Sequence, residues 1–373
     1  MILEEYRKET DYCTYCPKMC RFSCPVAETE LRETVTPTGK QTIVHLLREG
    51  ALELSEETVG IFFKCTGCMH CQQYCAHEID VPRSLEAART HAYNEGKTLP
   101  VVFNLAETMR KSGNPLGRPL LPELKKLAPV EYFGRKSGVL FFPGAHLIAE
   151  REGRDVRRAI AVLEALGVED LALPDQELMT AGMELLDMGD REGFAAHAAK
   201  VRAMIEPYHT VLTPAPENAW AIEGRYQEVG QGAAGRIKDF AGFLLEKMDA
   251  LGPELKPLGR KMVYHDPCTL ARRLDSIDAP REILRRCGVQ LEEAPWHGKD
   301  TNCCGAGGGY ADVFPDEATQ MARARLDECG VSRGGTLVSC SPRCESHLRG
   351  AAADSDAQVS SLIEVLAESL GIS

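Results

Sequence analysis

The chain has 373 residues, of which 44% are hydrophobic and 26% are charged, which is enough for the cores of two or three domains. Its formal net charge of −12 argues against nucleic acid and against an anionic membrane surface as partners. No run of about 18 apolar residues occurs, so the sequence predicts no membrane span of its own.

The fifteen cysteines are expected to be metal ligands rather than disulfides. The first residues lack the charged-then-apolar layout of an export signal. A reducing compartment keeps thiols free, and clustered thiols there are typically metal ligands. The sequence therefore predicts a cytoplasmic, metal-binding protein.

Two runs of four cysteines lie near the N-terminus. They read Cys13-x2-Cys16-x3-Cys20-x3-Cys24, followed by proline, and Cys65-x2-Cys68-x2-Cys71-x3-Cys75, followed by alanine. In two-cluster bacterial ferredoxins, the run C-x2-C-x2-C-x3-C-P sends its last cysteine to the other cluster. The spacing therefore predicts two [4Fe–4S] clusters with exchanged fourth ligands. The two expected sets are Cys13, Cys16, Cys20 with Cys75, and Cys65, Cys68, Cys71 with Cys24.

Structural zinc is the alternative metal. Zinc takes four ligands in paired C-x2-C units with a loop between the pairs, and two runs of four cysteines fit that pattern poorly. The first run has one residue more between Cys16 and Cys20 than the ferredoxin pattern, so Cys20 is the weakest match of the eight.

Helical stretches are expected between and after the two runs. They include residues 46–47, residues 52–59 and a helix that starts at Ser84, with Ser84 as its cap. An α-helical ferredoxin domain over residues 1–98 follows, and it resembles the C-terminal half of the iron–sulfur subunit of succinate dehydrogenase.

Residues 99–138 are predicted to be a basic, proline-rich linker. Five prolines are expected to break any long element there. The seven basic residues that mark this segment are Arg110, Lys111, Arg118, Lys125, Lys126, Arg135 and Lys136. The segment is interpreted as a solvated connector, with a docking strip for an acidic partner subunit as the alternative.

The rest of the chain reads as one α/β unit written twice, over residues 139–255 and 256–373. The apolar run 139–145 corresponds to 262–268, and each predicts a buried strand that ends at a proline turn. The separation from Ala145 to Gly182 is 37 residues, as is that from Cys268 to Gly305. The first copy has no cysteine at the matching positions, which are Ala145, Thr180, Ala181 and Ala215 in this pairing. It therefore cannot ligate iron through sulfur.

The cysteines of the second copy carry a family resemblance. Cys268, the pair Cys303-Cys304 before Gly305, and Cys340 resemble the cysteine-rich CCG domain of heterodisulfide reductase. An eight-cysteine ferredoxin fused to two CCG-type units resembles the D subunit of that enzyme. It is also similar to the iron–sulfur subunits of glycolate oxidase and anaerobic glycerol-3-phosphate dehydrogenase, and to the electron-input subunits of class II benzoyl-CoA reductase.

The resemblance implies a third, noncubane [4Fe–4S] cluster. Its implied ligands are Cys268, Cys303, Cys304, Cys340 and Cys344. The usual final pair of the family is C-x2-C, whereas three residues separate Cys340 from Cys344, which leaves Cys344 as the weakest match. In the family, cleavage of the heterodisulfide takes two noncubane clusters, and this chain has cysteines for one.

The function predicted from these features is that of an iron–sulfur electron-transfer subunit of a multi-subunit oxidoreductase. No flavin or nicotinamide motif occurs, so a flavoprotein or another iron–sulfur protein is expected as partner, which leaves room for a membrane-associated complex. One alternative is a disulfide or thiol reductase that acts at the C-terminal cluster. Another is a non-catalytic scaffold whose C-terminal cysteines bind zinc.

Several weaker sequence signals are better explained by ordinary packing than by a function. The glycine-rich run 305–309 would need a glycine at Tyr310 to be a dinucleotide fingerprint, so it is interpreted as backbone that crowds a cluster. Cys287 and Cys329 are expected in the core. His265 and His297 are interpreted as core histidines, with tuning or replacement of a ligand as the alternative. His70 is expected beside a cluster without binding it.

Overall fold

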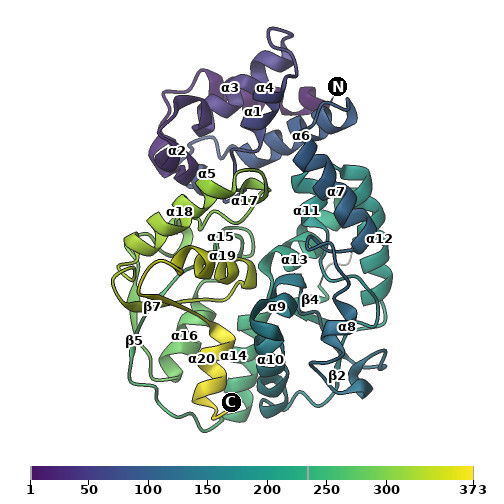
Figure 1. The fold of residues 1–373 in the computed structure, drawn as a ribbon, viewed down its shortest axis with the longest axis vertical. Helices are drawn as coiled ribbons and strands as arrows, with labels where there is room; N and C mark the ends of the chain where they lie inside the picture. The colour runs from purple at the N-terminus through teal and green to yellow at the C-terminus, as the bar shows by residue number, and fades with distance from the viewer. Residues whose placement is uncertain (1, 233–234, 373) are drawn as a thin grey trace.

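The computed structural model describes residues 2–232 and 235–372. A helical N-terminal part lies across one end of two α/β units that stand side by side (Figure 1). Its helices are α1 (Arg7–Thr14), α2 (Pro25–Glu30), α3 (Pro37–Arg48), α4 (Glu56–Phe62), α5 (His70–Gln73) and α6 (Val81–Asn94).

Side-chain caps set where these helices begin. The Thr36 hydroxyl accepts from the Gly39 N–H at 3.0 Å ahead of α3, and Ser55 and Thr58 form a capping box at α4. The helix expected over residues 52–59 therefore begins only at Glu56.

The expected cap at Ser84 is wrong. Helix α6 begins at Val81, and the Asp80 carboxylate caps it by accepting from the Arg83 N–H at 3.1 Å. Pro82 fits in the first turn, where its missing N–H would have no intrahelical partner. Ser84 is buried inside the helix, against Gln41.

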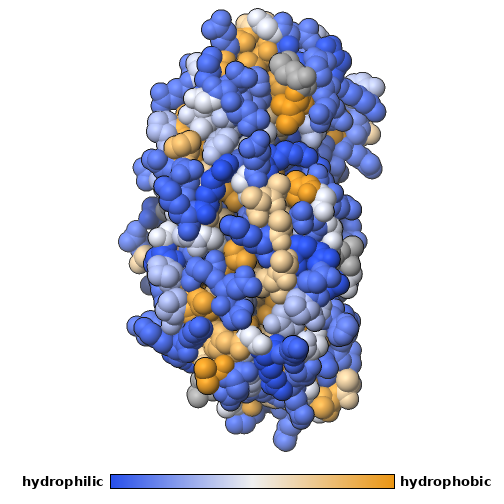
Figure 2. All heavy atoms as spheres, turned by 90° about the vertical axis from the view of Figure 1, so that its right-hand side faces the viewer, coloured by the Kyte–Doolittle hydropathy of each residue, from blue (hydrophilic) through white to orange (hydrophobic). Residues whose placement is uncertain are grey.

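The proline-rich segment also contains a long helix, contrary to expectation. Helix α7 (Pro100–Ser112) uses Pro100 as its first residue, and the short α8 (Leu121–Leu124) follows. Arg110, one of the basic residues of the expected strip, pairs with the Asp190 carboxylate at 2.5 Å. The face that carries α7 and α12 (Arg191–Ile205) is largely hydrophilic, with narrow apolar strips (Figure 2).

Each α/β unit contains a four-stranded parallel sheet. The first sheet has the order β2-β1-β3-β4 and the second β6-β5-β7-β8, so both sheets follow the same strand order. The strands of the first are β1 (Val139–Phe141), β2 (Leu171–Ala172), β3 (Thr210–Thr213) and β4 (Ile237–Asp239). Those of the second are β5 (Lys261–Tyr264), β6 (Gln290–Glu293), β7 (Gly335–Ser339) and β8 (Ala357–Ser361).

Helices connect these strands. In the first unit they are α9 (Ala145–Ala149), α10 (Arg154–Ala165), α11 (Met183–Asp187), α12, α13 (Pro216–Trp220) and α14 (Phe240–Leu251). In the second they are α15 (Cys268–Arg272), α16 (Asp278–Arg286), α17 (Tyr310–Val313), α18 (Pro315–Glu328), α19 (Pro342–Ala352) and α20 (Leu362–Ser369). Crossover helices are what parallel strands require.

The register of the two units corrects one pairing made from sequence. Strand β3 ends at Thr213 and α13 begins at Pro216, just as β7 ends at Ser339 and α19 begins at Pro342. In this register Ala215 matches Ser341, and Pro214 matches Cys340. The expected match of Ala215 to Cys340 is therefore off by one residue.

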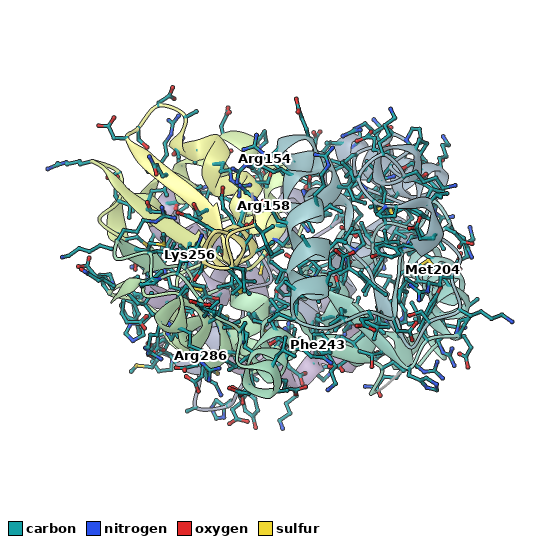
Figure 3. All side chains as sticks on the ribbon, turned by 90° about the horizontal axis from the view of Figure 1, so that it is seen from below. Arg154, Arg158, Met204, Phe243, Lys256 and Arg286 are labelled. Atoms are coloured by element: carbon teal, nitrogen blue, oxygen red, sulfur yellow. The ribbon has the colours of Figure 1, made fainter. Side chains whose placement is uncertain are left out.

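The two units pack through helices. Helix α10 packs on α20, and α14 packs on α16. Seen from below, Arg154 and Arg158 of α10 lie beside the C-terminal helix (Figure 3). Among the described residues, no helix is both long and apolar enough to cross a bilayer.

Candidate metal centre

The first N-terminal thiols gather at the end of α1. Cys13 is buried at the last turn of that helix, Cys16 and Cys20 follow in a loop, and Cys75 comes after α5. Burial raises the pKa of Cys13 to about 12, and the neighbouring thiols of Cys20, Cys75 and Cys16 add to that rise. Burial likewise raises the pKa of Cys20 to about 11.

The second set surrounds a buried lysine that the sequence analysis did not single out. Lys40 is 1% exposed, and its Nζ lies 3.7 Å from the Cys24 Sγ and donates to the Lys64 carbonyl at 2.7 Å. Burial alone would lower the pKa of Lys40, but the thiols around it outweigh this and raise it; they are Cys24, Cys65, Cys71 and Cys68. Lys40 is in phase with Pro37 and Val44 on the buried face of α3, and this is the sequence signal that could have found it.

In the C-terminal unit, four of the five implied ligands line one pocket: Cys268, Cys303, Cys304 and Cys344. The Sγ atoms of Cys268 and Cys303 are 3.9 Å apart. Potential ligand atoms of His265, Cys304 and Cys344 lie within 4.8 Å of one another. Hydrogen bonding with Cys303 and Cys344 lowers the pKa of the Cys304 thiol well below its usual range.

Cys340 lies outside this pocket. Its Sγ is 2.8 Å from the Tyr264 hydroxyl, and it lines a separate hollow beside Asp239 and Phe240. Burial raises its pKa, and the Tyr264 hydroxyl opposes that rise. The structure thus brings Cys344 to the other thiols and leaves Cys340 apart, which reverses the order of the two expected from the spacing.

His265 faces the thiols in a fixed tautomer. Its ring is fully buried, and its Nδ1 accepts from the Arg325 Nε–H at 3.2 Å. Arginine can only donate, so the proton of a neutral His265 must sit on Nε2. Its Nε2 has no hydrogen-bond partner among the described residues. An N–H at that atom, next to Cys304 and Cys344, is suited to donate to sulfur rather than to bind a metal.

Cys68, from the N-terminal part, meets Cys303, from the C-terminal unit. Cys68 packs against the buried cluster that contains Cys303. Hydrogen bonding with Cys303 is the largest cause that lowers the pKa of Cys68, and the charge of Arg272 adds to it. Arg272 donates to the Cys68 carbonyl and, at 2.8 Å each, to the carbonyls of Lys299 and Thr301. The two cysteine regions, far apart in sequence, are therefore in direct contact.

The glycine-rich run makes this contact. A Cβ on Gly307 would lie 2.7 Å from the Thr66 carbonyl oxygen, and one on Gly308 would lie 2.6 Å from the Thr66 carbonyl carbon. Tyr310, where a dinucleotide fingerprint needs glycine, is buried and donates to the Glu30 carboxylate at 2.8 Å. Because the run packs backbone against backbone, its glycines serve the interface between the two cysteine regions.

The remaining residues singled out from sequence are buried or bonded locally. Cys287 and Cys329 lie in apolar cores. The Nδ1 of His297 lies 2.8 Å from the Ala294 carbonyl. His70 is 1% exposed, and burial lowers its pKa, so its ring is neutral next to Cys71.

The donor sets fit iron–sulfur clusters. All fifteen cysteines are free, and sets of converging soft thiols suit iron–sulfur clusters. A buried cation at Lys40 offsets the negative charge that four thiolates bring. Cys13, Cys16, Cys20 and Cys75 would hold one cluster, and Cys24, Cys65, Cys68 and Cys71 another.

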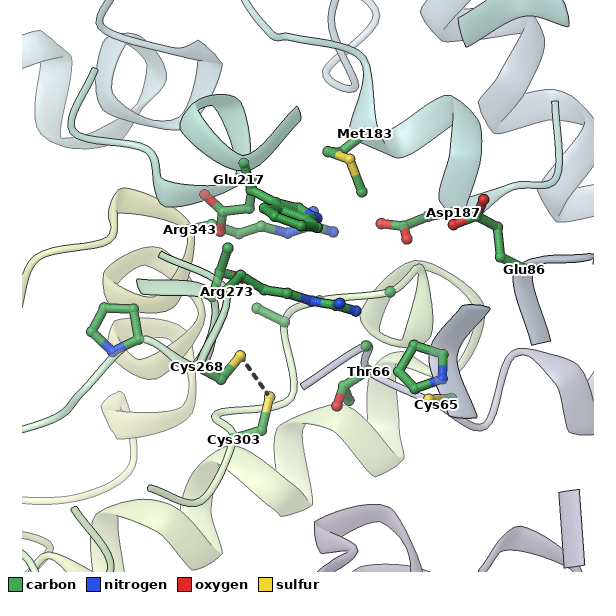
Figure 4. A pocket seen from close by; sticks show the side chains of 18 of the residues that line it. Cys65, Thr66, Glu86, Met183, Asp187, Glu217, Cys268, Arg273, Cys303 and Arg343 are labelled. Atoms are coloured by element: carbon green, nitrogen blue, oxygen red, sulfur yellow. Dashed lines mark hydrogen bonds between the residues drawn. The ribbon is translucent and has the colours of Figure 1, made fainter. Parts of the chain in front are cut away.

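A pocket separates the C-terminal thiols from the first α/β unit. Figure 4 shows Cys268 and Cys303 on one side, Met183 and Asp187 on the opposite side, and Arg273 and Arg343 reaching between them. Residues from the N-terminal part and from both units line it.

Comparison with known proteins agrees with this chemistry. Residues 9–79 match the family model of a 4Fe-4S dicluster domain, and residues 262–349 match that of the CCG cysteine-rich domain. An uncharacterized iron–sulfur protein of Methanocaldococcus jannaschii is 28% identical over 357 residues, which cover 92% of this chain and 68% of that protein. The B subunit of the fumarate reductase (CoM/CoB) of Methanothermobacter marburgensis is 24% identical, with coverage of 97% and 73%.

The D subunit of the dihydromethanophenazine:CoB–CoM heterodisulfide reductase of Methanosarcina mazei is 28% identical, with coverage of 83% and 78%. A crystal structure of a hypothetical protein from Helicobacter pylori superimposes with a TM-score of 0.55 at 12% identity, over 100% of this chain and 76% of that one, which shows a shared fold alone. The chain thus joins a 4Fe-4S dicluster domain to a CCG cysteine-rich domain, and its relatives include the D subunit of heterodisulfide reductase and other iron–sulfur oxidoreductases.

Proposed function

We propose that this chain is the iron–sulfur subunit of a multi-subunit oxidoreductase and relays electrons through three [4Fe–4S] clusters. The packing of Cys68 against the buried cluster that contains Cys303 and Cys24 carries the proposal, because it joins the N-terminal thiols to the C-terminal ones. Two of the clusters belong to the 4Fe-4S dicluster domain, with Cys75 and Cys24 exchanged between the two runs. The third would be held by Cys268, Cys303, Cys304 and Cys344, and when bound it would supply the one-electron chemistry of that region.

The proposed relay has two distinct ends. Cys65 of the second set lines the C-terminal pocket, whereas Cys13, Cys16, Cys20 and Cys75 do not. Large apolar side chains are exposed near these four cysteines: Tyr15 is 79% exposed, Met19 68% and Phe22 50%. We infer that a redox partner, a flavoprotein or another iron–sulfur protein, docks at this end, since exposed apolar patches mark interaction surfaces.

We also propose that the two α/β units, residues 139–255 and 256–373, are a tandem repeat with residues 1–98 as the ferredoxin domain and 99–138 as the connecting segment. Equal strand order supports this. The helix contacts support it too. Helix α10 of the first unit is equivalent to α16 of the second, and α14 is equivalent to α20, so the contacts of α10 with α20 and of α14 with α16 are the same contact made in both directions. Helices α13 and α19 are likewise equivalent, as are α9 and α15, so the contacts of α13 with α15 and of α19 with α9 form a second such pair.

Anaerobic purification and metal analysis test the proposal. We expect a brown protein with about twelve irons and as much sulfide per chain, and paramagnetic signals from more than one cluster after reduction. A colourless protein that contains zinc would contradict it and would favour the scaffold alternative.

Disulfide or thiol reduction at the C-terminal cluster remains the second candidate, because a pocket adjoins its thiols. Small disulfides that alter the paramagnetic signal of the oxidised C-terminal cluster would favour this activity. Reduction of all clusters by a partner flavoprotein, with no effect of any small thiol or disulfide, would favour the relay.

A further inference from the structure

The pocket beside the C-terminal thiols is lined by residues of both α/β units, and the cysteine-free first unit forms much of its wall. The four thiols that would hold the third cluster form one side of it, so a ligand in the remaining space would lie next to that cluster. Met183, Asp187 and Glu217 come from the first unit and lie across from Cys268 and Cys303 (Figure 4), and Trp220 of the first unit lines the same space. The first unit therefore shapes the space next to the thiols, in addition to packing against the second unit.

Five arginines line this space, and three of them are each held by two or more partners. Arg83 and Arg225 pair with Glu86 and Glu228. Arg89 donates to three backbone carbonyls, those of Phe62, Cys65 and Asp187. These side chains hold the pocket together and have little capacity left for a ligand.

Arg273 and Arg343 differ. Among the described residues, Arg343 donates only to Asp312, at 3.3 Å, and Arg273 only to Asp80, at 3.0 Å. Each guanidinium has five N–H donors, so most of theirs are free. Their side chains are only 11% and 14% exposed, and both reach into the hollow (Figure 4). Free, shielded guanidinium donors bind carboxylates in a two-bonded geometry.

The other side chains of the pocket suit a ligand that has both an anionic group and an apolar part. Arg273 lies over the Trp220 ring at 5.1 Å, and Met183 adds a second apolar surface. Asp187 and Glu217 also line the hollow, and their charges act on Arg343. Burial raises the pKa of Asp187 to about 6 and raises that of Glu217, so Asp187 still carries most of its charge at pH 7 and a bound anion must outcompete it for the guanidinium donors. Pockets that combine an apolar wall with a few convergent polar groups are typical ligand sites.

We propose that this pocket binds a small organic carboxylate, with Arg343 and Arg273 as its carboxylate-binding residues and Trp220 and Met183 as its apolar wall. The bound molecule would lie beside Cys268 and Cys303. This inference extends the proposed function, since a relay alone needs no ligand site, but the arginine geometry on which it stands does not depend on the clusters.

Isothermal titration calorimetry on the anaerobically purified full chain tests the site. The probes are acetate, malonate, glutarate and benzoate, with chloride at equal ionic strength as the ionic control. We expect saturable binding of at least one carboxylate at one site per chain. Arg343→Gln and Arg273→Gln should each weaken that binding by tenfold or more. Arg343→Lys should weaken it less than Arg343→Gln, because lysine keeps the charge and loses the planar fork.

Arg260→Gln is the matched control, because Arg260 is an exposed arginine paired with Glu368 outside the pocket, and it should bind as the parent does. Circular dichroism and iron content of every variant check that the fold and clusters persist. The proposal is overturned if no carboxylate gives saturable heat, or if folded Arg343→Gln and Arg273→Gln bind like the parent. Binding by a chain without iron would overturn the proposed function alone, whereas iron without binding would overturn this site alone.

Discussion

At the residue scale, buried charged and polar side chains lie next to particular cysteines. Lys40 places a cation among Cys24, Cys65, Cys68 and Cys71. His265, whose tautomer Arg325 fixes, lies next to Cys304 with no hydrogen-bond partner at Nε2 among the described residues. Charges and hydrogen bonds near cluster sulfurs set reduction potential, so these side chains are expected to tune electron flow.

Lys40→Met should lower the reduction potential of the second N-terminal cluster. One positive charge a few ångströms away stabilises the reduced, more negative cluster by about 2 kcal/mol, or roughly 90 mV for a one-electron couple. Redox titration followed by electron paramagnetic resonance measures the shift. Lys40→Arg, which keeps the charge, is the control, and an unchanged potential in Lys40→Met would show that Lys40 does not compensate cluster charge.

The positions of Cys340 and Cys344 predict opposite results for two matched substitutions. Cys344→Ser should lose about four of about twelve irons, because its thiol lies with Cys304. Cys340→Ser should keep its iron, because its thiol bonds to Tyr264 outside the pocket. Iron and sulfide analysis checks both, and loss of iron from Cys340→Ser would restore Cys340 as a ligand.

At the element scale, the loop from Gly305 to Gly309 joins the two cysteine regions. It presses backbone to backbone on Cys65 and Thr66, and Lys64 adds ion pairs to Glu30 at 3.0 Å and Glu317 at 3.1 Å. A loop with side chains could not approach so closely, so the path between the two regions depends on the absence of Cβ atoms here.

Gly308→Ala should separate the two regions. Gly308 has a φ of +63°, and Gly330, with a φ of +70° and nothing within 4 Å of its Cβ position, is the matched control. Both substitutions carry the backbone cost of about 1–2 kcal/mol, but only Gly308→Ala adds a clash worth about 1–3 kcal/mol. Urea unfolding measures the difference, and rapid-freeze paramagnetic resonance should show slower reduction of the C-terminal cluster in Gly308→Ala alone.

At the scale of the whole molecule, the helix pairs α10 with α20 and α14 with α16 hold the two units together. Glu364 of α20 accepts from Arg151 at 2.8 Å and from Arg158 at 2.9 Å. Burial tends to raise the pKa of Glu364, but the two arginines outweigh it and bring the pKa to about 2. The pocket and the contact between the cysteine regions depend on how these units sit together.

Glu364→Gln should lower the free energy of unfolding at pH 7 by about 2 kcal/mol, because it removes the carboxylate that Arg151 and Arg158 share and leaves them only Asp155. A carboxyl whose pKa is lower in the folded chain stabilises that state above its ordinary value of 4.5, so the difference should shrink as the pH falls from 4.5 toward 2. Urea unfolding across this range measures it. Glu368→Gln, at an exposed pair, should change stability by less than about 0.5 kcal/mol, and an equal loss in both variants would contradict a special role for Glu364.

The sequence by itself determined the chemistry, because cluster ligation depends on cysteine spacing within short loops: it indicated the 4Fe-4S dicluster domain at the first two runs and the CCG cysteine-rich domain around Cys303 and Cys304. It also indicated the parallel α/β units from their apolar runs. Local rules failed where a neighbouring residue competed, as at Asp80, which caps α6 in place of Ser84.

Tertiary structure alone determined which distant segments of the chain are in contact. The meeting of Cys68 with Cys303, the burial of Lys40, the separation of Cys340 from Cys344, and the free donors of Arg343 all depend on contacts between segments far apart in the chain. No spacing rule encodes such contacts, because they arise from the packing of the N-terminal helices and the two α/β units against one another.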